Sequence, residues 1–339
     1  MPMKRFASAL LVAAATAASS AFAADMPVKA PPPAAAATPP WDVVITAALM
    51  NDYNFRGITQ SNHQPSAQAG FEARYNWNAN FQGYAGVSGE SISFPNRAAA
   101  EVDFYGGIRP TFDKLALDFG VWYYYYPDGQ CFNTVALCNS LGGGNFTAVS
   151  LPNGNVVKEN LSFIEGYAKA TYTVNDALAL GIQEWYSPSV LNSGADGWYT
   201  VGNVTFTAPS SWFPANSGLG GYVSADLGYW ALGTSDAFYG TGAVFPALGW
   251  QYANGVKYTS YWNWDAGFGW TYKAFTLDLR YYDTNLTKAQ CNVFTSDQTA
   301  TFGGAGAVTA QNPGGLASNW CGAAYIAKLS FAANLSGLK

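Results

Sequence analysis

Residues 115–126 read Leu-Ala-Leu-Asp-Phe-Gly-Val-Trp-Tyr-Tyr-Tyr-Tyr and carry the pattern that decides the fold. Large apolar side chains occupy every odd position from Leu115 to Tyr125, whereas Asp118 and Gly120 stand among the even positions. This period-two alternation predicts a β-strand, because successive side chains of a strand point to opposite faces. An apolar face backed by a face of charge and glycine is typical of a barrel wall with lipid outside and water inside.

The same alternation recurs from residue 41 onward and predicts twelve strands. They are Trp41–Tyr53, Ser66–Tyr75, Phe81–Ser91, Ala99–Arg109, Leu115–Tyr126, Leu161–Val174, Leu178–Ser187, Trp198–Ala208, Gly221–Ala231, Tyr261–Tyr272, Phe275–Asp283 and Ala323–Phe331. No stretch shows a convincing helical period. The predicted fold class is therefore all-β, a transmembrane antiparallel β-barrel of about 12 strands.

The connections between these strands give an independent test of the barrel. Outer-membrane barrels have short periplasmic turns, longer external loops and both chain ends in the periplasm. Long and short connections alternate along this chain, and the longest are residues 127–160, 232–260 and 284–322. The exception is Pro209–Gly220, a long connection on the short side. It leaves ten or fourteen strands as alternatives.

The composition indicates a surface that faces something other than water. Only 11% of the 339 residues are charged, against about 25% in ordinary soluble domains, while 49% are hydrophobic. The apolar content excludes disorder, and the net charge of −5 argues against a nucleic-acid partner. Beyond the N-terminal segment no stretch approaches 18 consecutive apolar residues, so a membrane could be crossed only by a closed sheet.

The chain is predicted to have three parts. Two basic residues precede an apolar run from Phe6 to Ala18, and the small residues Ala21 and Ala23 follow it. Residues 1–23 are therefore predicted to be a secretory signal peptide. Residues 24–40 are rich in Pro and Ala and predict an extended periplasmic spacer. Residues 41–339 form the barrel. Export by a signal peptide then indicates the bacterial outer membrane, with membrane lipid as partner.

Residues 52–61 read Asp52-Tyr53-Asn54-Phe55-Arg56-Gly57-Ile58-Thr59-Gln60-Ser61. This segment resembles the TorF family of porins, in which a D-Y-x-F-R-G-[IV]-[ST]-Q motif follows the first strand of an outer-membrane barrel. The matching positions are Asp52, Tyr53, Phe55, Arg56, Gly57 and Gln60. The resemblance implies a barrel with a solute pore and assigns no catalytic residue. The Pro-rich spacer, the Cys-bearing loops and a tail after Phe331 depart from the family pattern.

The four cysteines lie in two long loops. In a twelve-stranded ring these loops stand on opposite sides of the mouth, so the local pairs Cys131–Cys138 and Cys291–Cys321 are preferred over crossing pairs. A metal site of four thiols is disfavoured, because no C-x-x-C spacing is present. The sequence therefore predicts two disulfides and no metal.

His63 is the only histidine of the chain. A single histidine argues strongly against the class of barrel enzymes that use imidazole as a general base. The protein is therefore predicted not to be an enzyme. His63 lies in the first external loop, where we expect a solvated side chain. In the same loop, Arg56 is expected to form a structural pair with Asp52 rather than a constriction contact, because Gly57 indicates a tight turn that needs bracing.

Charged side chains fall on the inward faces of the predicted strands. The nine acids are Glu72, Glu90, Glu101, Asp103, Asp118, Glu165, Asp226, Asp265 and Asp278, and the five bases are Arg74, Arg109, Lys169, Arg280 and Lys328. A wet lumen lined in this way would mildly favour cations. Alternatively the charges pair across strands and plug the barrel, since twelve strands lie between the filled and the open barrel sizes. The open, narrow channel is favoured.

The sequence thus predicts a porin-like channel for passive diffusion of small hydrophilic solutes or ions, with mild cation preference and no cofactor. A closed barrel acting as a structural or surface-interaction protein through residues 127–160 and 284–322 is the first alternative, and an outer-membrane hydrolase is the second. The residues do not identify the solute, and they leave a homo-oligomer open.

Overall fold

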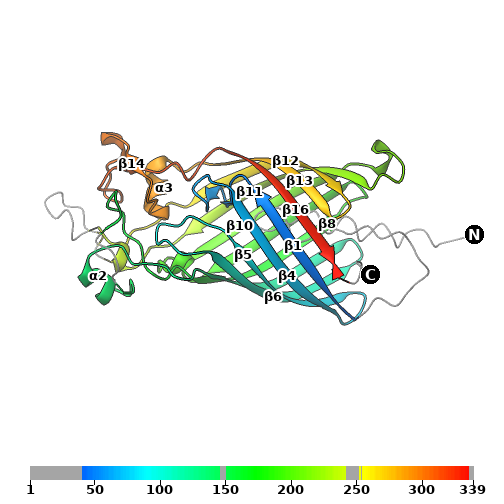
Figure 1. The fold of residues 1–339 in the computed structure, drawn as a ribbon, viewed down its shortest axis with the longest axis horizontal. Helices are drawn as coiled ribbons and strands as arrows, with labels where there is room; N and C mark the ends of the chain where they lie inside the picture. The colour runs from blue at the N-terminus through cyan, green and yellow to red at the C-terminus, as the bar shows by residue number, and fades with distance from the viewer. Residues whose placement is uncertain (1–39, 146–149, 242–251, 253, 336–339) are drawn as a thin grey trace, which may run out of the picture.

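The barrel of this chain is seen in a computed structural model that describes residues 40–145, 150–241, 252 and 254–335. Twelve antiparallel strands form a closed barrel, in which the first strand pairs with the last (Figure 1). The strands are β1 (Trp41–Met50), β4 (Ser66–Asn76), β5 (Phe81–Glu90), β6 (Glu101–Phe112), β7 (Leu115–Tyr125), β8 (Phe163–Thr173), β9 (Leu178–Ser187), β10 (Gly197–Thr207), β11 (Leu219–Leu232), β12 (Tyr261–Tyr272), β13 (Phe275–Thr284) and β16 (Ala324–Asn334).

The predicted fold class is confirmed, and so are all twelve predicted strands, whose ends differ from the observed ones by at most three residues. The observed connection between β10 and β11, residues 208–218, holds a 3₁₀ turn, Ser210–Trp212, and no further barrel strand. Because β10 and β11 on either side of it pair directly, ten and fourteen strands are excluded. The signal peptide and almost all of the spacer lie outside the described residues.

The C-terminal tail is the main difference between the predicted and observed strands. The sequence places a tail after Phe331, but β16 continues to Asn334, which pairs with Val44 of β1. The extra residues are needed because β1 starts at Trp41 and its N-terminal half would otherwise have no partner on that side. An unpaired backbone edge in a barrel wall is costly, so the seam extends to cover it.

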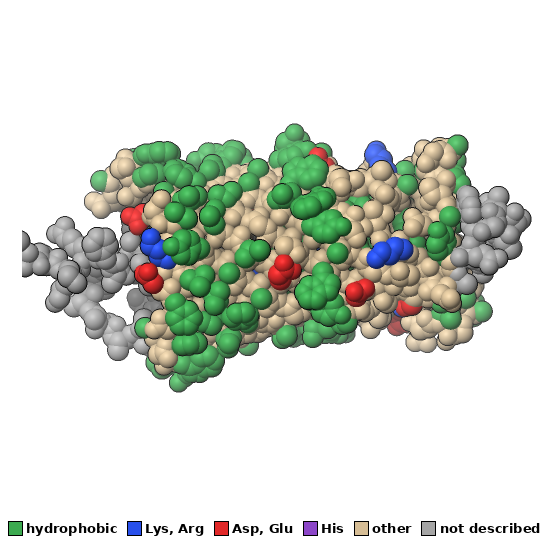
Figure 2. All heavy atoms as spheres, turned by 180° about the vertical axis from the view of Figure 1, so that it is seen from behind, with side chains coloured by type: hydrophobic (Ala, Val, Ile, Leu, Met, Phe, Trp, Pro, Cys, Tyr) green, Lys and Arg blue, Asp and Glu red, His purple; other side chains and the backbone are tan. Residues whose placement is uncertain are grey.

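Most of the large side chains exposed on the outer wall are apolar. On β7, Val121 is 54% exposed and Tyr125 is 42% exposed, whereas the intervening Trp122 and Tyr124 are buried inside. Figure 2 shows hydrophobic side chains spread over the barrel, with few charges between them. Water would solvate this surface poorly, because exposed apolar area costs roughly 25 cal/mol per Å². The wall is therefore suited to a hydrocarbon surrounding.

Short helices and hairpins occupy the long connections at one end of the barrel, opposite the end where β1 starts and β16 stops (Figure 1). They are α2 (Val135–Ser140), α3 (Lys288–Thr295), the hairpin β2 (Asn54–Phe55) with β3 (Ile58–Thr59), and the pair β14 (Thr301–Phe302) with β15 (Leu316–Ala317). Among the described residues, the helices are too short and too polar to cross a bilayer.

Two disulfides join residues within single loops, as predicted. Cys131 bonds to Cys138 beside α2, and Cys291 of α3 bonds to Cys321 at the far end of the same connection. A crossing pair would have required the two loops to meet over the mouth. Each disulfide instead closes its own loop and shortens the chain that is free to move.

Candidate functional site

The lumen is filled with side chains over much of its length. All the predicted lumen charges lie on inward positions of the strands, as the alternation requires. Asp103 and Glu165 are 0% exposed and Glu72 is 2% exposed. A residue that lined an open aqueous passage would contact water. In the described conformation these charges instead contact one another and the aromatic side chains around them.

One charge network lies on β4, β6 and β7, toward the end where the chain enters the barrel. Arg109 donates to both carboxylate oxygens of Glu72, at 2.7 and 2.9 Å, and to Asp118 at 3.3 Å. Arg74 forms a second ion pair with Glu72. The Arg109 guanidinium also lies 3.6 Å from the centroid of the Tyr84 ring. Bidentate pairing of this kind fixes the arginine in place and neutralises the acids.

A second network lies across the barrel on β11, β12 and β13. Arg280 is its centre: it forms ion pairs with Asp265 and Asp278 and approaches Asp226 at 4.0 Å. It also donates to the Ser224 hydroxyl at 2.6 Å. The predicted base Lys328 lies opposite Asp278 of this network in register, whereas Lys169 lies opposite Asp118 of the first network. Most predicted acids are thus compensated by a neighbouring base.

The first loop, residues 51–65, turns into the lumen instead of outward. Its β2–β3 hairpin places Arg56 beside Glu165 of β8, and the guanidinium donates to both carboxylate oxygens at 2.9 and 2.7 Å. Both side chains are almost fully buried. The turn needs Gly57, whose φ is +81° and where a Cβ would lie 2.2 Å from Thr284. We call this inserted segment, residues 54–59, the hairpin plug.

Aromatic side chains surround the guanidinium of the hairpin plug. Its carbon lies 4.2 Å from the centroid of the Tyr199 ring, 4.3 Å from that of Trp230 and 4.6 Å from that of Phe55. The Tyr261 hydroxyl donates to the Arg56 carbonyl at 3.0 Å. A cation among aromatic faces and one carboxylate is held strongly when water is excluded. The expected pair between Arg56 and Asp52 is wrong, because the turn directs Arg56 into the barrel.

Asp52 has a different task at the base of the hairpin plug. Its carboxylate accepts hydrogen bonds from Thr59 at 2.5 Å and Ser61 at 3.0 Å, and contacts Nδ1 of His63 at 2.8 Å. His63 Nε2 contacts the carbonyl of Asn319 at 2.9 Å. The hydrogen bond with Asp52 raises the pKa of His63, and this effect outweighs burial, which lowers it. His63 therefore bridges two loops, and its side chain is still 42% exposed, in agreement with the solvated position that the sequence suggested.

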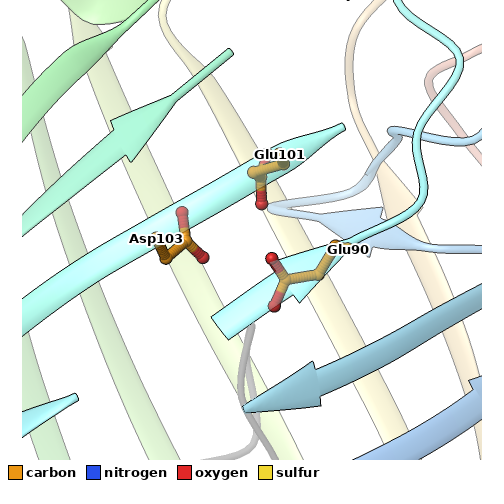
Figure 3. Close-up of side chains that lie close together, drawn as sticks. All are labelled: Glu90, Glu101 and Asp103. Atoms are coloured by element: carbon orange, nitrogen blue, oxygen red, sulfur yellow. The ribbon is translucent and has the colours of Figure 1, made fainter. Parts of the chain in front are cut away.

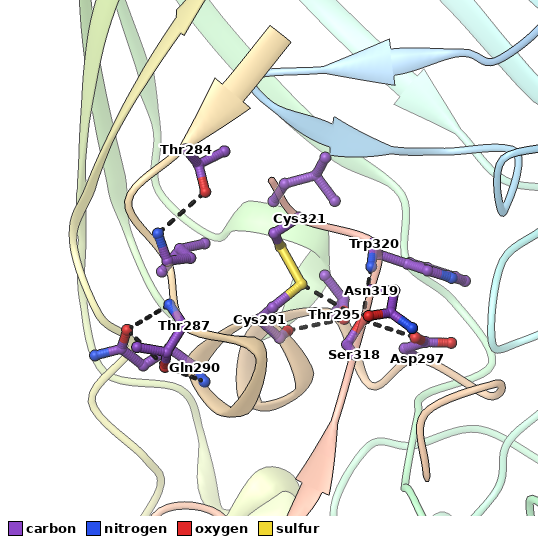
Figure 4. The surroundings of a disulfide bond; sticks show 12 residues. Thr284, Thr287, Gln290, Cys291, Thr295, Asp297, Ser318, Asn319, Trp320 and Cys321 are labelled. Carbon is purple, nitrogen blue, oxygen red and sulfur yellow. Dashed lines mark hydrogen bonds between the residues drawn. A yellow bond between two sulfur atoms is a disulfide. The ribbon is translucent and has the colours of Figure 1, made fainter. Parts of the chain in front are cut away.

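The last loop, residues 285–323, covers the mouth and seats the hairpin plug. Figure 4 shows the Cys291–Cys321 disulfide joining α3 to the returning chain, with Ser318 and Asp297 hydrogen-bonded beside it. The Thr59 amide donates to the Trp320 carbonyl at 2.9 Å. A cavity of about 40 Å³ remains between the hairpin plug, the last loop and the strand ends nearest the long loops, which we call the upper ends. It has room for a few water molecules.

Glu90, Glu101 and Asp103 form a third group at the upper ends of β5 and β6 (Figure 3). Tyr53, the second residue of the sequence motif, donates to Glu101 at 2.6 Å, and Tyr126 donates to its other oxygen at 2.6 Å. The period-two pattern predicts that these acids face inward. It does not reveal that they converge, because convergence depends on the register between two strands.

The aromatic surroundings of Arg56 were missed by the sequence reasoning. Tyr199, Trp230 and Tyr261 all lie on inward positions near the upper ends of their strands. That placement is visible in the alternation, and inward aromatics at several neighbouring strand ends are a signal for a filled mouth. The sequence does not show that the first loop turns into the lumen. That loop supplies Arg56, the cation that these aromatic side chains enclose.

Comparisons with known proteins add a family of unknown activity. Residues 34–142 match the model of a family described as a bacterial protein of unknown function, Gcw_chp. The match covers less than half of the chain, and the TorF resemblance stays a prediction. No curated protein matches the chain.

The solved structures that resemble this chain have low sequence identities to it and low TM-scores. The NanC porin is 10% identical over 85% of this chain and 98% of its own, with a TM-score of 0.40. OprB of Pseudomonas putida is 10% identical over 87% and 94%, with a TM-score of 0.37. LpxR from Salmonella typhimurium is 9% identical over 85% and 99%, with a TM-score of 0.38. The fold assignment above therefore stands on the strand pairing alone.

Proposed function

We propose that the protein is a barrel of the bacterial outer membrane that passes small hydrophilic solutes or ions, and that the hairpin plug holds it closed in the described conformation. The apolar outer wall and the closed sheet support the membrane location. Lipid offers no hydrogen bonds, and a closed barrel satisfies its own backbone. Passage through the lumen would need no cofactor.

The observation that carries the proposal is the hairpin plug itself. A barrel interior built only for stability is at least as well served by apolar side chains, because buried ion pairs repay little of their desolvation cost. Here a loop places a buried cation opposite a wall carboxylate, Glu165, through noncovalent contacts. Such a segment can leave as one unit. The polar wall that it uncovers, including Glu165 and Asn263, would then be hydrated.

A cation preference, if the channel opens, would depend on a small part of the lumen. Most of the inward acids are paired with Arg56, Arg74, Arg109 or Arg280. Glu90, Glu101 and Asp103 have no ion-pair partner among the described residues. The predicted preference would therefore come from this group near the mouth and not from the overall excess of acids.

Planar-bilayer conductance tests the proposal. The double variant Arg56→Ala with Glu165→Ala removes both charges of the plug contact and leaves neither one unpaired in the lumen. We expect the wild-type protein to open rarely and the double variant to stay open longer, with a larger mean current. The matched control is Asp176→Asn in the exposed turn between β8 and β9, which should behave as wild type. Inserted protein that never gives current steps in either form would exclude the channel.

A closed structural or surface-interaction barrel is the second candidate. The burial of the lumen charges favours it, since a barrel that never opens has no need of an accessible interior. In that case α2 and the last loop would be the contact surfaces for a partner. The same conductance measurement separates the two candidates, because only the channel responds to loss of the plug contact.

We propose further that the protein is not an enzyme. Ser61 and His63 both contact Asp52, and the other ring nitrogen of His63 faces the Asn319 carbonyl. The imidazole therefore has no nitrogen free to take a proton from Ser61, as a catalytic triad would require. Turnover of lipid or peptide by the purified barrel, with loss of this activity in the variant His63→Ala, would contradict the proposal.

A further inference from the structure

Glu165, Tyr199 and Trp230 form a site on the inner face of the barrel that already holds a guanidinium group. The group belongs to Arg56 of the hairpin plug, which donates to both carboxylate oxygens of Glu165 at 2.9 and 2.7 Å. The ring centroids of Tyr199 and Trp230 lie 4.2 and 4.3 Å from its carbon. We call these three residues the wall site. Its ligand in the described conformation is thus a side chain of the same chain.

The wall site is held in shape by contacts within the barrel. Its three residues lie on β8, β10 and β11 of the closed sheet. The Tyr124 hydroxyl donates to Glu165 at 3.1 Å, and the Tyr199 hydroxyl donates to Asn263 at 3.0 Å. Trp230 packs edge to face against Tyr199, with ring centroids 6.0 Å apart. None of these contacts involves the hairpin plug, so we expect the wall site to keep its shape without the plug and to bind a ligand with little reorganisation.

The chemistry of the wall site favours a guanidinium group over an ammonium group. Two parallel N–H groups of a guanidinium match the two oxygens of one carboxylate, and the planar cation also lies well against aromatic faces. Arg56 makes both kinds of contact at once. An ammonium ion is a compact point charge that holds its water more strongly, so it loses more on entering a buried site.

Departure of the plug leaves Glu165 in need of a cation. Glu165 is fully buried, and Arg56 is its only ion-pair partner among the described residues. The other inward arginines, Arg109 and Arg280, are engaged by different acids. A carboxylate beside aromatic rings is costly when its partner is removed, until water or another cation compensates it. A guanidinium compound from solution can make the same contacts as Arg56.

We propose that the wall site binds solutes that carry a guanidinium group, and that Arg56 is a built-in competitor for it. The solute and the hairpin plug exclude each other, so the solute favours the open barrel and binds at the wall site during passage. The inference rests on the proposed channel function, because a displaced plug gives the solute access to the wall site.

Thermal unfolding of the full chain in detergent tests binding without any current. In Arg56→Ala the plug lacks its guanidinium group, so methylguanidinium can fill the wall site. At millimolar concentrations it should raise the unfolding midpoint with saturation, because a ligand of the folded state stabilises that state. Methylammonium carries the same charge and should bind at least tenfold more weakly. The variant Arg56→Ala with Glu165→Ala should respond to neither cation.

The wild-type protein is the control for competition. Its own Arg56 occupies the wall site, so the same rise in midpoint should need at least tenfold more methylguanidinium than in Arg56→Ala. Equal responses of the wild-type protein, Arg56→Ala and the double variant would place binding elsewhere and overturn the proposal.

Refolding covers the case in which Arg56→Ala does not fold alone. The denatured variant is diluted into detergent with methylguanidinium, with methylammonium or with neither, and the folded barrel is detected by its gel mobility without heating. Methylguanidinium alone should recover the folded form. Equal yields under the three conditions, including no folding in any of them, overturn the proposal.

Planar-bilayer currents separate the wall site from the channel itself. Methylguanidinium should lower the mean current of Arg56→Ala at a concentration at least tenfold below that needed of methylammonium, and the double variant should not distinguish the two cations. Currents that respond equally to both cations in Arg56→Ala, with no saturable rise in its midpoint, overturn the wall site and leave the channel. A rise specific to methylguanidinium in protein that never conducts supports the wall site and overturns the channel.

Discussion

Arg56 shows how one residue can determine the state of the whole lumen. It adopts a positive φ of 52°, which a side chain other than glycine avoids unless its surroundings compensate. The compensation comes from Glu165 and from the aromatic rings that enclose the guanidinium. Gly57 then completes the turn without a clash. The turn is thus held by contacts with the barrel wall and also by hydrogen bonds within the loop, such as the one from the Gly57 amide to Oδ1 of Asn54 at 2.9 Å.

Residue-level reasoning from the sequence succeeds for direction and fails for partners. Period two correctly predicts that Glu72, Asp118 and Arg280 face inward, because direction depends only on position along one strand. It cannot predict that Arg56 pairs with Glu165 and not with Asp52, because that pairing needs the path of a loop across the lumen.

His63 should titrate above its ordinary pKa of about 6.5. Its protonated ring can donate to both Asp52 and the Asn319 carbonyl, and the bond to Asp52 is the main cause of the raised pKa. A raised pKa means that the contact stabilises the fold fully below about pH 6.5 and loses this effect as the pH rises through the folded-state pKa. Because the chain has one histidine, an NMR titration reports its pKa directly.

The control for that titration is the variant Asp52→Asn, in which the neutral amide should lower the pKa of His63 toward the ordinary value. A pKa of His63 at or below 6.5 in the wild-type protein would show that the bridge between Asp52 and Asn319 is absent in solution.

The last loop is the element that ties the mouth together. Its helix α3 starts at Thr287 with a capping box, in which Thr287 and Gln290 satisfy each other's backbone amides. The residues Thr287-Lys288-Ala289-Gln290 are a recognisable start signal in the sequence. The periodicity argument missed the helix because eight residues make too few turns for an apolar stripe to show. Strands of ten residues or more carry a far clearer pattern.

Opening the Cys291–Cys321 disulfide should loosen the last loop and the hairpin plug beneath it. The bond closes a segment with a sequence separation of 30, against 7 for Cys131–Cys138. Loop-closure entropy assigns about 3–4 kcal/mol to the longer loop and about 2–3 kcal/mol to the shorter. In limited proteolysis, the paired variant Cys291→Ser with Cys321→Ser should be cut in both the last and the first loop.

The matched comparison is Cys131→Ser with Cys138→Ser. It should leave the last loop protected, because Asn153 and Asn155, which bond that loop, lie outside the segment that this disulfide closes. Identical cleavage patterns in the two paired variants would mean that the longer disulfide does not hold the mouth closed.

At the scale of the whole molecule, the barrel could be predicted but its filling could not. Apolar and polar side chains alternate, and long and short connections alternate, because antiparallel strands cross a membrane. Both patterns can therefore be detected in the sequence. Whether a lumen of twelve strands is open depends on how loops fold back into it. An open channel was favoured from the sequence, whereas the described conformation is filled by the hairpin plug and the charge networks.

Charge on the outer wall should destabilise the barrel as it would at a lipid contact. Leu227, midway along β11, and Val135, on α2, are each 53% exposed. In lipid vesicles, Leu227→Arg should lower the free energy of unfolding by about 2–4 kcal/mol, because a charge near the bilayer centre is costly. Val135→Arg should change it by less than about 0.5 kcal/mol. Urea titration measures both, and equal effects would contradict a lipid-facing wall.

The inward course of the first loop also determines which segments a particle that approaches the cell surface would contact. Residues 52–61 lie beneath the last loop, so a phage fibre or an antibody approaching from outside would touch α2, α3 and the β14–β15 pair instead. Changes selected by such visitors would fall on those outer segments and leave Arg56 and Glu165 untouched. The segments that cover the mouth are therefore distinct from the Arg56–Glu165 contact that closes the barrel beneath them.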